Sequence, residues 1–163
     1  MNKAQFIAQG AKPTVTRKFD ASIDFVWRAW TEADLLDQWW APSPWQSKTK
    51  EMTFEPNGKR LYAMVGPEGE EHWGLTTYLS IDKHKMFSGT DAFCDNSGQV
   101  NNELPEATFV NQFKDGDETT TVTVITEYAS EEHLEQVIQM GMKEGLEMAF
   151  ENLDQVLEKL NSQ

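Results

Sequence analysis

The sequence predicts an α+β domain in which helices cover one face of an antiparallel sheet. Helix signals come twice in quick succession between residues 19 and 45, alternating β-forming stretches fill residues 46–128, and a helical period runs from Ser130 almost to the end. A sheet of six to seven strands needs its apolar face covered, and the C-terminal helix carries a matching apolar stripe. With 163 residues, the chain is expected to form a single domain over residues 1–163.

The chain opens with residues 1–12, which we expect to be loosely ordered, and its regular pattern begins with a strand over residues 14–20. That stretch, TVTRKFD, alternates and is rich in β-forming residues, with no Gly or Pro to interrupt it. It leads directly into a helix that has Ser22 as N-cap and Asp24 in its first turn. The apolar stripe of this helix has four members at helical spacing: Ile23, Val26, Trp27 and Trp30.

A second short helix is predicted to follow at once. Thr31 with Asp34 three residues later matches a capping box, and Pro42 ends the helix. Its apolar side is formed by Leu35, Leu36 and Trp39. Two short helices joined without a linker turn sharply and cannot form a core alone, so the pair needs the larger apolar surface of a sheet.

The middle of the chain is predicted to form a run of antiparallel strands. A Pro-Asn-Gly turn at residues 56–58 and a Lys-Asp-Gly-Asp turn at residues 114–117 each close a hairpin. The predicted strands cover residues 46–54, 59–65, 72–81, 85–93, 107–113 and 119–128. In the third of these strands, the residues predicted to share one side are Trp73, Leu75, Thr77, Leu79 and Ile81.

One long helix is predicted from Ser130, its N-cap, to the end of the chain. About 30 residues make a rod on the order of 45 Å, long enough to cross the sheet. Gly141 and Gly145 inside this helix each cost up to about 1 kcal/mol relative to alanine. With Ala149 they form a row of small residues, which either lets the helix approach the sheet closely or leaves space for a ligand. Because a straight helix touches a curled sheet only in places, a cavity between them is expected.

Charge and composition exclude several classes of partner. Of the net charge of −13, residues 103–163 contribute −11, from 14 acids and 3 bases. Such a surface disfavours nucleic acid and anionic membranes. The acidic C-terminal third is either a solvated face or a docking surface for a basic protein partner. The first 13 residues hold no apolar run long enough for a signal peptide, and no stretch approaches a membrane span, so we expect a soluble cytoplasmic protein.

The sequence predicts neither catalytic residues nor a metal or cofactor. His72, His84 and His133 lie far apart, in no spacing typical of metal ligands. Motifs of catalytic nucleophiles and phosphate-binding loops do not occur. Cys94 is a single cysteine, so it forms no internal disulfide.

The tryptophans divide into two groups by position. Trp27 and Trp30, at helical spacing, are predicted to lie in the core. Trp40 and Trp45 flank two prolines in a predicted loop, and we place them nearest the mouth of any cavity.

The tryptophan-rich stretch FDAS…VWRAWTEADLLDQWWAP resembles the opening motif of the activator of heat-shock protein 90 ATPase homologue-like proteins, a branch of the START-like (SRPBCC) superfamily. The matching positions are Arg17 to Ala21, Val26, Trp27, Ala29 to Thr31, Trp39, Trp40 and Pro42. The likeness continues through the later hairpins to the closing helix, so it covers nearly the whole chain. It implies a helix-grip fold, in which a curved sheet holds a long C-terminal helix around a hydrophobic cavity.

The glycine row and the implied cavity together predict a non-enzymatic protein that binds a small hydrophobic or aromatic ligand between sheet and helix. The predicted contacts are Trp40, Tyr62, Met64, Trp73, Leu75, Phe109, Asn111, Met142, Gly145 and Leu146. One alternative is a cyclase-like or hydrolase-like enzyme that uses Tyr62, His72 or Asn111 as acid or hydrogen-bond donor. Another is a protein-interaction or chaperone-linked module that uses the acidic C-terminal third.

Overall fold

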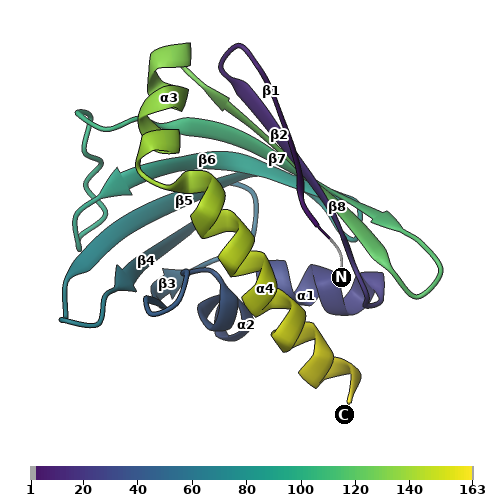
Figure 1. The fold of residues 1–163 in the computed structure, drawn as a ribbon. Coiled ribbons are helices and arrows are strands. Elements are labelled where there is room, and N and C mark those ends of the chain that lie inside the picture. The colour runs from purple at the N-terminus through teal and green to yellow at the C-terminus, as the bar shows by residue number, and fades with distance from the viewer. Residues whose placement is uncertain (1–2, 163) are drawn as a thin grey trace.

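Within residues 3–162, which the computed structural model describes, the chain forms one eight-stranded antiparallel sheet and four helices (Figure 1). The strands follow the spatial order β1-β2-β8-β7-β6-β5-β4-β3. Their bounds are β1 Gln5–Gln9, β2 Lys12–Phe19, β3 Gln46–Met52, β4 Lys59–Val65, β5 Glu71–Asp82, β6 Met86–Cys94, β7 Ala107–Asp115 and β8 Thr120–Tyr128. The predicted α+β class is confirmed, with more strands than the six to seven expected.

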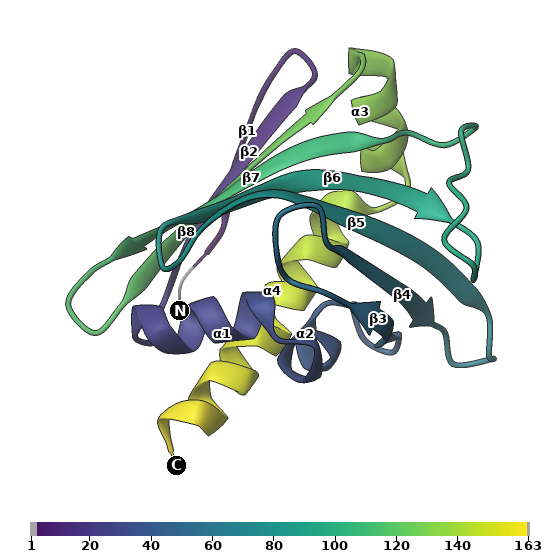
Figure 2. The same ribbon diagram turned by 180° about the vertical axis from the view of Figure 1, so that it is seen from behind.

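The sheet is curved, and all four helices lie on its concave side or at its ends (Figures 1 and 2). Helix α4 crosses that side diagonally, while α1 and α2 lie together below it. The helix bounds are α1 Ile23–Thr31, α2 Ala33–Trp39, α3 Glu131–Gln139 and α4 Met142–Asn161. The helix pair α1–α2 carries the chain from β2, near one edge of the sheet, to β3 at the other.

Helix α1 begins as the sequence predicts. Ser22 is its N-cap, and its Oγ accepts a hydrogen bond from the backbone N of Phe25 at 3.3 Å. Val26, Trp27 and Trp30 of the predicted stripe are buried. The aromatic rings of the core meet edge to face, as aromatic pairs prefer: the Trp27 and Phe113 centroids lie 5.1 Å apart at an interplanar angle of 70°.

The capping box predicted for α2 is wrong. Thr31 is the last residue of α1, and its Oγ1 donates to the carbonyl oxygen of Trp27 at 2.8 Å. Glu32 is therefore the N-cap of α2, without a side-chain capping bond. The physical reason is that a threonine hydroxyl can bond back to the carbonyl four residues earlier in its own helix, and here that bond competes with capping.

The expectation that residues 1–12 are loosely ordered is wrong for the part that the structure describes, since Gln5–Gln9 form strand β1. Gln9 pairs with Lys12 across a two-residue turn, and Gly10 adopts a φ of 60° there. Two-residue hairpin turns require such positive φ values, which glycine adopts without strain. Phe6 packs against the core, and the Nζ of Lys143 lies 4.2 Å from its ring centroid. The first two residues lie outside the described part.

The single C-terminal helix expected from Ser130 is in fact two helices. Ser130 does cap the first, α3, through its Oγ, which accepts from the backbone N of His133 at 3.2 Å. The chain then breaks at Gly141, which has a φ of 93° and a ψ of 24° and starts α4. Because this conformation is left-handed, the helical hydrogen-bond ladder cannot pass through it. The predicted row of small residues on one continuous helix therefore does not exist.

Helix α4 is tied to the sheet by a charged pair. The Nη1 and Nη2 atoms of Arg17, on β2, each donate to a carboxylate oxygen of Asp154 at 2.7 Å. Arg17 is buried, and its guanidinium carbon lies 4.7 Å from the centroid of Phe19. This bidentate pair fixes the distance of α4 from the sheet and the rotation of α4 about its own axis.

The two glycines are expected to respond in opposite ways to alanine. Gly145→Ala should raise the free energy of unfolding by about 0.5–1 kcal/mol, because alanine favours a helix interior. A Cβ at Gly145 would meet only Cγ of Pro42, at an ordinary 3.7 Å. Gly141→Ala should lower the free energy of unfolding by about 1–2 kcal/mol, because its φ is positive. Urea denaturation measures both, and changes of the same sign would contradict the break at Gly141.

Candidate functional site

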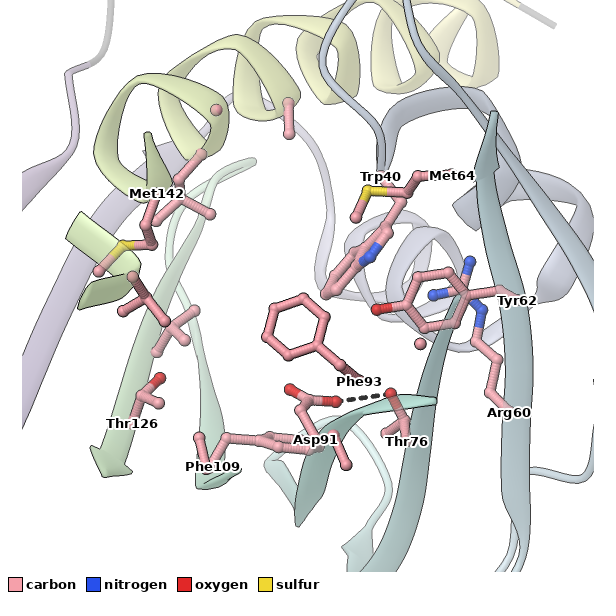
Figure 3. Close-up of a pocket in the computed structure, with 18 of the residues that line it drawn as sticks. Trp40, Arg60, Tyr62, Met64, Thr76, Asp91, Phe93, Phe109, Thr126 and Met142 are labelled. Atoms are coloured by element: carbon pink, nitrogen blue, oxygen red, sulfur yellow. Dashed lines mark hydrogen bonds between the residues drawn. The ribbon is translucent and has the colours of Figure 1, made fainter. Parts of the chain in front are cut away.

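A cavity of about 440 Å³ lies between the concave face of the sheet, the α3–α4 region and the chain around Trp39 to Pro42. Figure 3 shows it from within, with Met142 and Thr126 on one side and Trp40, Met64 and Tyr62 on the other. Its wall is mostly apolar. The aromatic residues in that wall are Trp30, Trp39, Trp40, Tyr62, His72, Trp73, Tyr78, Phe87, Phe93, Phe109 and Tyr128.

The break at Gly141 places flexible side chains over the cavity. Met140 and Met142, on either side of it, both line the cavity, as do Gly145 and Leu146 in the first turns of α4. Met140 is among the exposed apolar residues, with 57% of its surface accessible. Methionine adapts its shape to what it contacts, so this part of the wall can fit ligands of different outline.

The opposite wall is formed by two aromatic rings that pack against a buried arginine. The rings of Trp40 and Tyr62 meet edge to face at 6.2 Å. The guanidinium carbon of Arg60 lies 4.1 Å from the Tyr62 centroid and 5.4 Å from the Trp40 centroid. These distances are within the range of cation–π attraction, so Arg60 holds both rings in place.

Arg60 is 2% exposed, and polar groups on its far side compensate its charge. Its Nη2 donates to Ser47 Oγ at 3.0 Å and lies 3.4 Å from Oδ1 of Asp37, while its Nε donates to Thr49 Oγ1 at 3.2 Å. Asp37 also accepts from Ser47 and from both the backbone N and the hydroxyl of Thr49. This network joins α2 to β3 and β4 and fixes the wall that Trp40 and Tyr62 form.

Tyr62 fits into the cavity because the facing strand carries a glycine. A Cβ at Gly74 would lie 2.6 Å from the Tyr62 hydroxyl oxygen, closer than real contacts allow. Burial, helped by the negative charge of Asp91, raises the pKa of Tyr62 to about 12. The Tyr62 hydroxyl is therefore protonated at neutral pH.

An acidic side chain also faces the cavity. Asp91, on β6, accepts a 2.6 Å hydrogen bond from Thr76 Oγ1 on β5 (dashed in Figure 3). Burial raises the pKa of Asp91 to about 6, against the lowering effects of the Thr76 hydrogen bond and of the Arg60 charge. Asp91 therefore changes between a neutral hydrogen-bond donor and a charged acceptor near physiological pH.

Asp91→Asn should make the protein more stable than the parent at pH 8, by about 2–3 kcal/mol. The folded pKa of Asp91, about 6, exceeds the ordinary value of 3.8, so the folded state binds more protons between these values. The stability of the parent therefore falls as pH rises through this window, whereas a neutral asparagine avoids the loss. Urea denaturation from pH 4 to 8 measures the difference, which should vanish near pH 4; a constant difference would contradict a raised pKa.

Two buried polar atoms in the wall have no hydrogen-bond partner among the described residues: Nε1 of Trp30 and Oδ1 of Asn111. Both residues line the cavity, Trp30 from α1 and Asn111 from β7. Buried polar groups in folded proteins are almost always hydrogen-bonded, so these two atoms are exceptions to that rule.

The structure brings most of the predicted contact residues together. The nine that line the cavity are Trp40, Tyr62, Met64, Trp73, Phe109, Asn111, Met142, Gly145 and Leu146. Their role in binding a ligand stays a prediction. Trp73 is at the margin, because its indole lies 5.8 Å from Nζ of Lys50 and its Nε1 donates to Glu71 at 3.4 Å.

Leu75 is a wrong prediction, because it does not line the cavity. On β5, Gly74, Thr76 and Tyr78 alternate along the face that lines the cavity, and Leu75 points to the other face. Of the five residues predicted to share one side of this strand, only Trp73 lines the cavity, at its margin. The sequence pattern misleads here because the cavity face of β5 holds glycine and threonine, which leave room for Tyr62 and bond to Asp91.

The mouth of the cavity differs in part from expectation. Trp40 lines the cavity, whereas Trp45 lines a separate, more polar depression beside it. The Trp45 ring still lies 5.3 Å from that of His72, an exposed residue that contributes to the cavity wall. Trp30, predicted to be core, is buried and lines the cavity as well.

Asp91, Thr76 and Thr126 line the cavity but are not among the residues predicted from the sequence. One signal was available for Asp91: it alternates with Phe87 and Phe93 on β6, the pattern of residues that share one face of a strand. Thr76 and Thr126 carry no comparable signal, since threonine is as common on an exposed face as on a buried one.

The described residues contain no group of three or more His, Cys, Asp or Glu side chains that could hold a metal ion. None of the helices described is long and apolar enough to cross a membrane. The acids of the C-terminal region are largely on the outer faces of α3 and α4, where Glu131, Glu135, Glu144 and Glu151 are exposed.

The sequence of the chain matches the model of one protein family. Its sequence model, described as Activator of Hsp90 ATPase homolog 1-like protein, matches residues 20–158. A search of curated proteins finds no match.

Solved structures with a similar fold include a protein from Arthrobacter aurescens, with a TM-score of 0.89 and 27% identity over 95% of this chain and 91% of that one. Protein Ms6760 from Mycobacterium smegmatis has a TM-score of 0.86 and 30% identity, over 95% of both chains. A protein from Staphylococcus epidermidis, at 24% identity, has a TM-score of 0.85 over 95% of this chain and 94% of that one, which shows the shared fold.

Proposed function

The chain belongs to the Activator of Hsp90 ATPase homolog 1-like family, with its START-like fold, and we propose that it binds a small apolar molecule in the cavity between sheet and α4. The observation that carries the proposal is the cavity itself, about 440 Å³ in volume and lined mainly by aromatic and aliphatic side chains. Small-molecule sites in proteins typically have volumes of about 300–1,000 Å³ and walls of this kind.

The arrangement of the wall supports binding over simple packing. Arg60 and Asp37 brace the aromatic side, so Trp40 and Tyr62 are held in position before a ligand enters. Preorganisation of this kind lowers the entropic cost of binding. The opposite side, with Met140 and Met142, is adaptable. A rigid wall facing a flexible one suits a flat apolar molecule that enters past α4.

Blocking the cavity tests the proposal. Thr126, on β8, points into it from the side opposite Tyr62 (Figure 3). Thr126→Trp places an indole in the space that a ligand would use. Glu127→Trp is the matched control, because Glu127 is the next residue on the same strand and is exposed on the other face. Binding of 2-methylnaphthalene, followed by amide chemical shifts in NMR, should be lost in the first variant and retained in the second.

The location of the shift changes decides the outcome. In the parent protein they should cluster on β4, β6, β8 and the start of α4, with Tyr62, Asp91 and Leu146 among the most affected. Equal binding by parent and Thr126→Trp, or shift changes confined to the outer face of the sheet, would contradict the proposal. A protein partner on the acidic faces of α3 and α4 stays a prediction, which a pull-down at low salt tests.

A further inference from the structure

Of the described residues that line the cavity, Asp91 is the only acid. One oxygen of its carboxylate, Oδ1, accepts the 2.6 Å hydrogen bond from Thr76. The other, Oδ2, has no hydrogen-bond partner among the described residues and is not one of the unpartnered atoms that the protein encloses. Because the side chain is half-buried, Oδ2 keeps surface in the open space of the cavity. Figure 3 shows the carboxylate between Tyr62 and Thr126, with this oxygen directed away from Thr76.

The negative charge of Asp91 has no ion-pair partner among the described residues. The charge of Arg60 acts on it and lowers its pKa, but that guanidinium is paired with Asp37 and packs against the rings of Tyr62 and Trp40. Burial outweighs this effect and raises the pKa of Asp91 to about 6. The charged carboxylate is therefore incompletely compensated by the protein, and a cation from outside would stabilise it.

The charge of Asp91 also reaches the other strands around the cavity. Burial and, to a smaller extent, the negative charge of Asp91 raise the pKa of three tyrosines in the wall. They are Tyr62 on β4, Tyr78 on β5 and Tyr128 on β8. These phenols stay neutral at physiological pH. Of the described residues in the wall, the bases are Arg60 and His72, and His72 is exposed to solvent. The cavity thus presents one open negative charge to a ligand.

We propose that the ligand of the cavity is an apolar molecule that carries a protonated amine, and that the amine donates a hydrogen bond to Oδ2 of Asp91. This rests on the proposed function and names the ligand class for the same cavity. A protonated amine supplies both a donor and the missing positive charge, whereas a hydroxyl supplies only the donor. Phe93, two residues further along the same face of β6, offers its ring to the apolar body. The net charge of −13 favours the approach of cations and disfavours anions.

Three probes of nearly the same shape test the ligand class. 2-Ethylnaphthalene, 2-(hydroxymethyl)naphthalene and 2-(aminomethyl)naphthalene differ only in the end group, which is a methyl, a hydroxyl or an amine that is protonated at neutral pH. Titration calorimetry with the parent protein at physiological salt should show the amine binding about tenfold more tightly than the alcohol. This is the ratio expected when a charged hydrogen bond replaces a neutral one. The amine is the most water-soluble of the three, so the hydrophobic effect alone would give the opposite order.

Two variants assign the preference for the amine to Asp91. Asp91→Asn removes the charge and keeps the size of the side chain, so it should retain binding of 2-ethylnaphthalene and abolish the tenfold preference for the amine over the alcohol. Asp115→Asn is the matched control, because Asp115 is exposed on β7 and does not line the cavity. It changes the net charge by the same amount and should keep the preference. Circular dichroism establishes that both variants are folded.

Each other result overturns the inference in a distinguishable way. If the parent binds the alcohol as tightly as the amine, the amine site is overturned, while the proposed function stands as long as 2-ethylnaphthalene binds in the cavity. If none of the three probes binds, both are overturned. If Asp91→Asn keeps the preference, the amine contacts another group and the assignment to Asp91 is wrong. If Asp115→Asn loses the preference as well, it arises from the net charge of the protein and not from a site in the cavity.

Discussion

Asp37→Ala should lower the free energy of unfolding by about 3–5 kcal/mol, the range for breaking a buried ion pair by removing one partner. Asp37 lies 3.4 Å from Nη2 of Arg60, whose side chain is 2% exposed, and it accepts further hydrogen bonds from Ser47 and Thr49. Without the carboxylate, the buried guanidinium keeps two hydroxyls and the rings of Tyr62 and Trp40 as neighbours, but it loses its anionic partner. Asp37 itself is 28% exposed, which places the expected loss toward the lower end.

Urea denaturation measures this loss, and a second substitution shows its cause. Arg60→Met in the Asp37→Ala background should recover part of the stability, because the uncompensated buried charge is then gone. Gln38→Ala is the control on the same helix. Its side chain is exposed and bonds only to the backbone of Asp34, so the change should stay within about 0.5 kcal/mol. A double variant less stable than Asp37→Ala alone would contradict the buried-charge argument.

Trp27→Ala should also cost about 3–5 kcal/mol of the free energy of unfolding, here through loss of aromatic packing. The Trp27 ring lies edge to face against Phe54, Phe87 and Phe113, with centroid distances of 6.1, 5.8 and 5.1 Å. Alanine would leave a void beneath α1, among the rings of Phe87 and Phe113 from the sheet and of Phe54 from the connection between β3 and β4. Thermal and urea unfolding measure the effect.

Trp40→Ala provides the contrast with Trp27→Ala. Trp40 is half-buried in the cavity wall, whereas Trp27 does not line the cavity. Trp40→Ala should therefore cost less stability and should weaken binding of 2-methylnaphthalene. Under conditions in which the Trp27→Ala variant is fully folded, its affinity for 2-methylnaphthalene should equal that of the parent. The reverse pattern would show that the division between core and cavity tryptophans is wrong.

Local sequence signals predicted the elements that depend on local physics. The hairpin over β3 and β4 follows from the turn at residues 56–58, and Ser22 and Ser130 both cap helices as predicted. Strand β4 has the predicted bounds, Lys59–Val65. In each case the determining interaction lies within a few residues along the chain.

The candidate site was predictable only in part, because its composition follows from which face of each strand turns inward. Most of the predicted contacts line the cavity, since apolar residues on β4, β7 and α4 face it. Leu75 was misassigned because the inner face of β5 carries Gly74 and Thr76, and Asp91 was missed because it is a polar residue between Phe87 and Phe93 on the inner face of β6. Hydrophobic alternation identifies the two sides of a strand, but it identifies the buried side only where that side is the apolar one.

The sequence by itself determined the class of fold, the family and the aromatic stretch around which the domain is built, because these depend on periodicity, caps and a motif within one segment. Only the tertiary structure decided the break at Gly141, the pairing of Arg60 with Asp37, and the position of Asp91 beside Thr76 in the cavity wall. Arg60 and Asp37 are 23 residues apart and meet because α2 packs against β3, which pairs with β4. A buried ion pair of this kind is a property of the packed arrangement, and no single segment of the chain contains it.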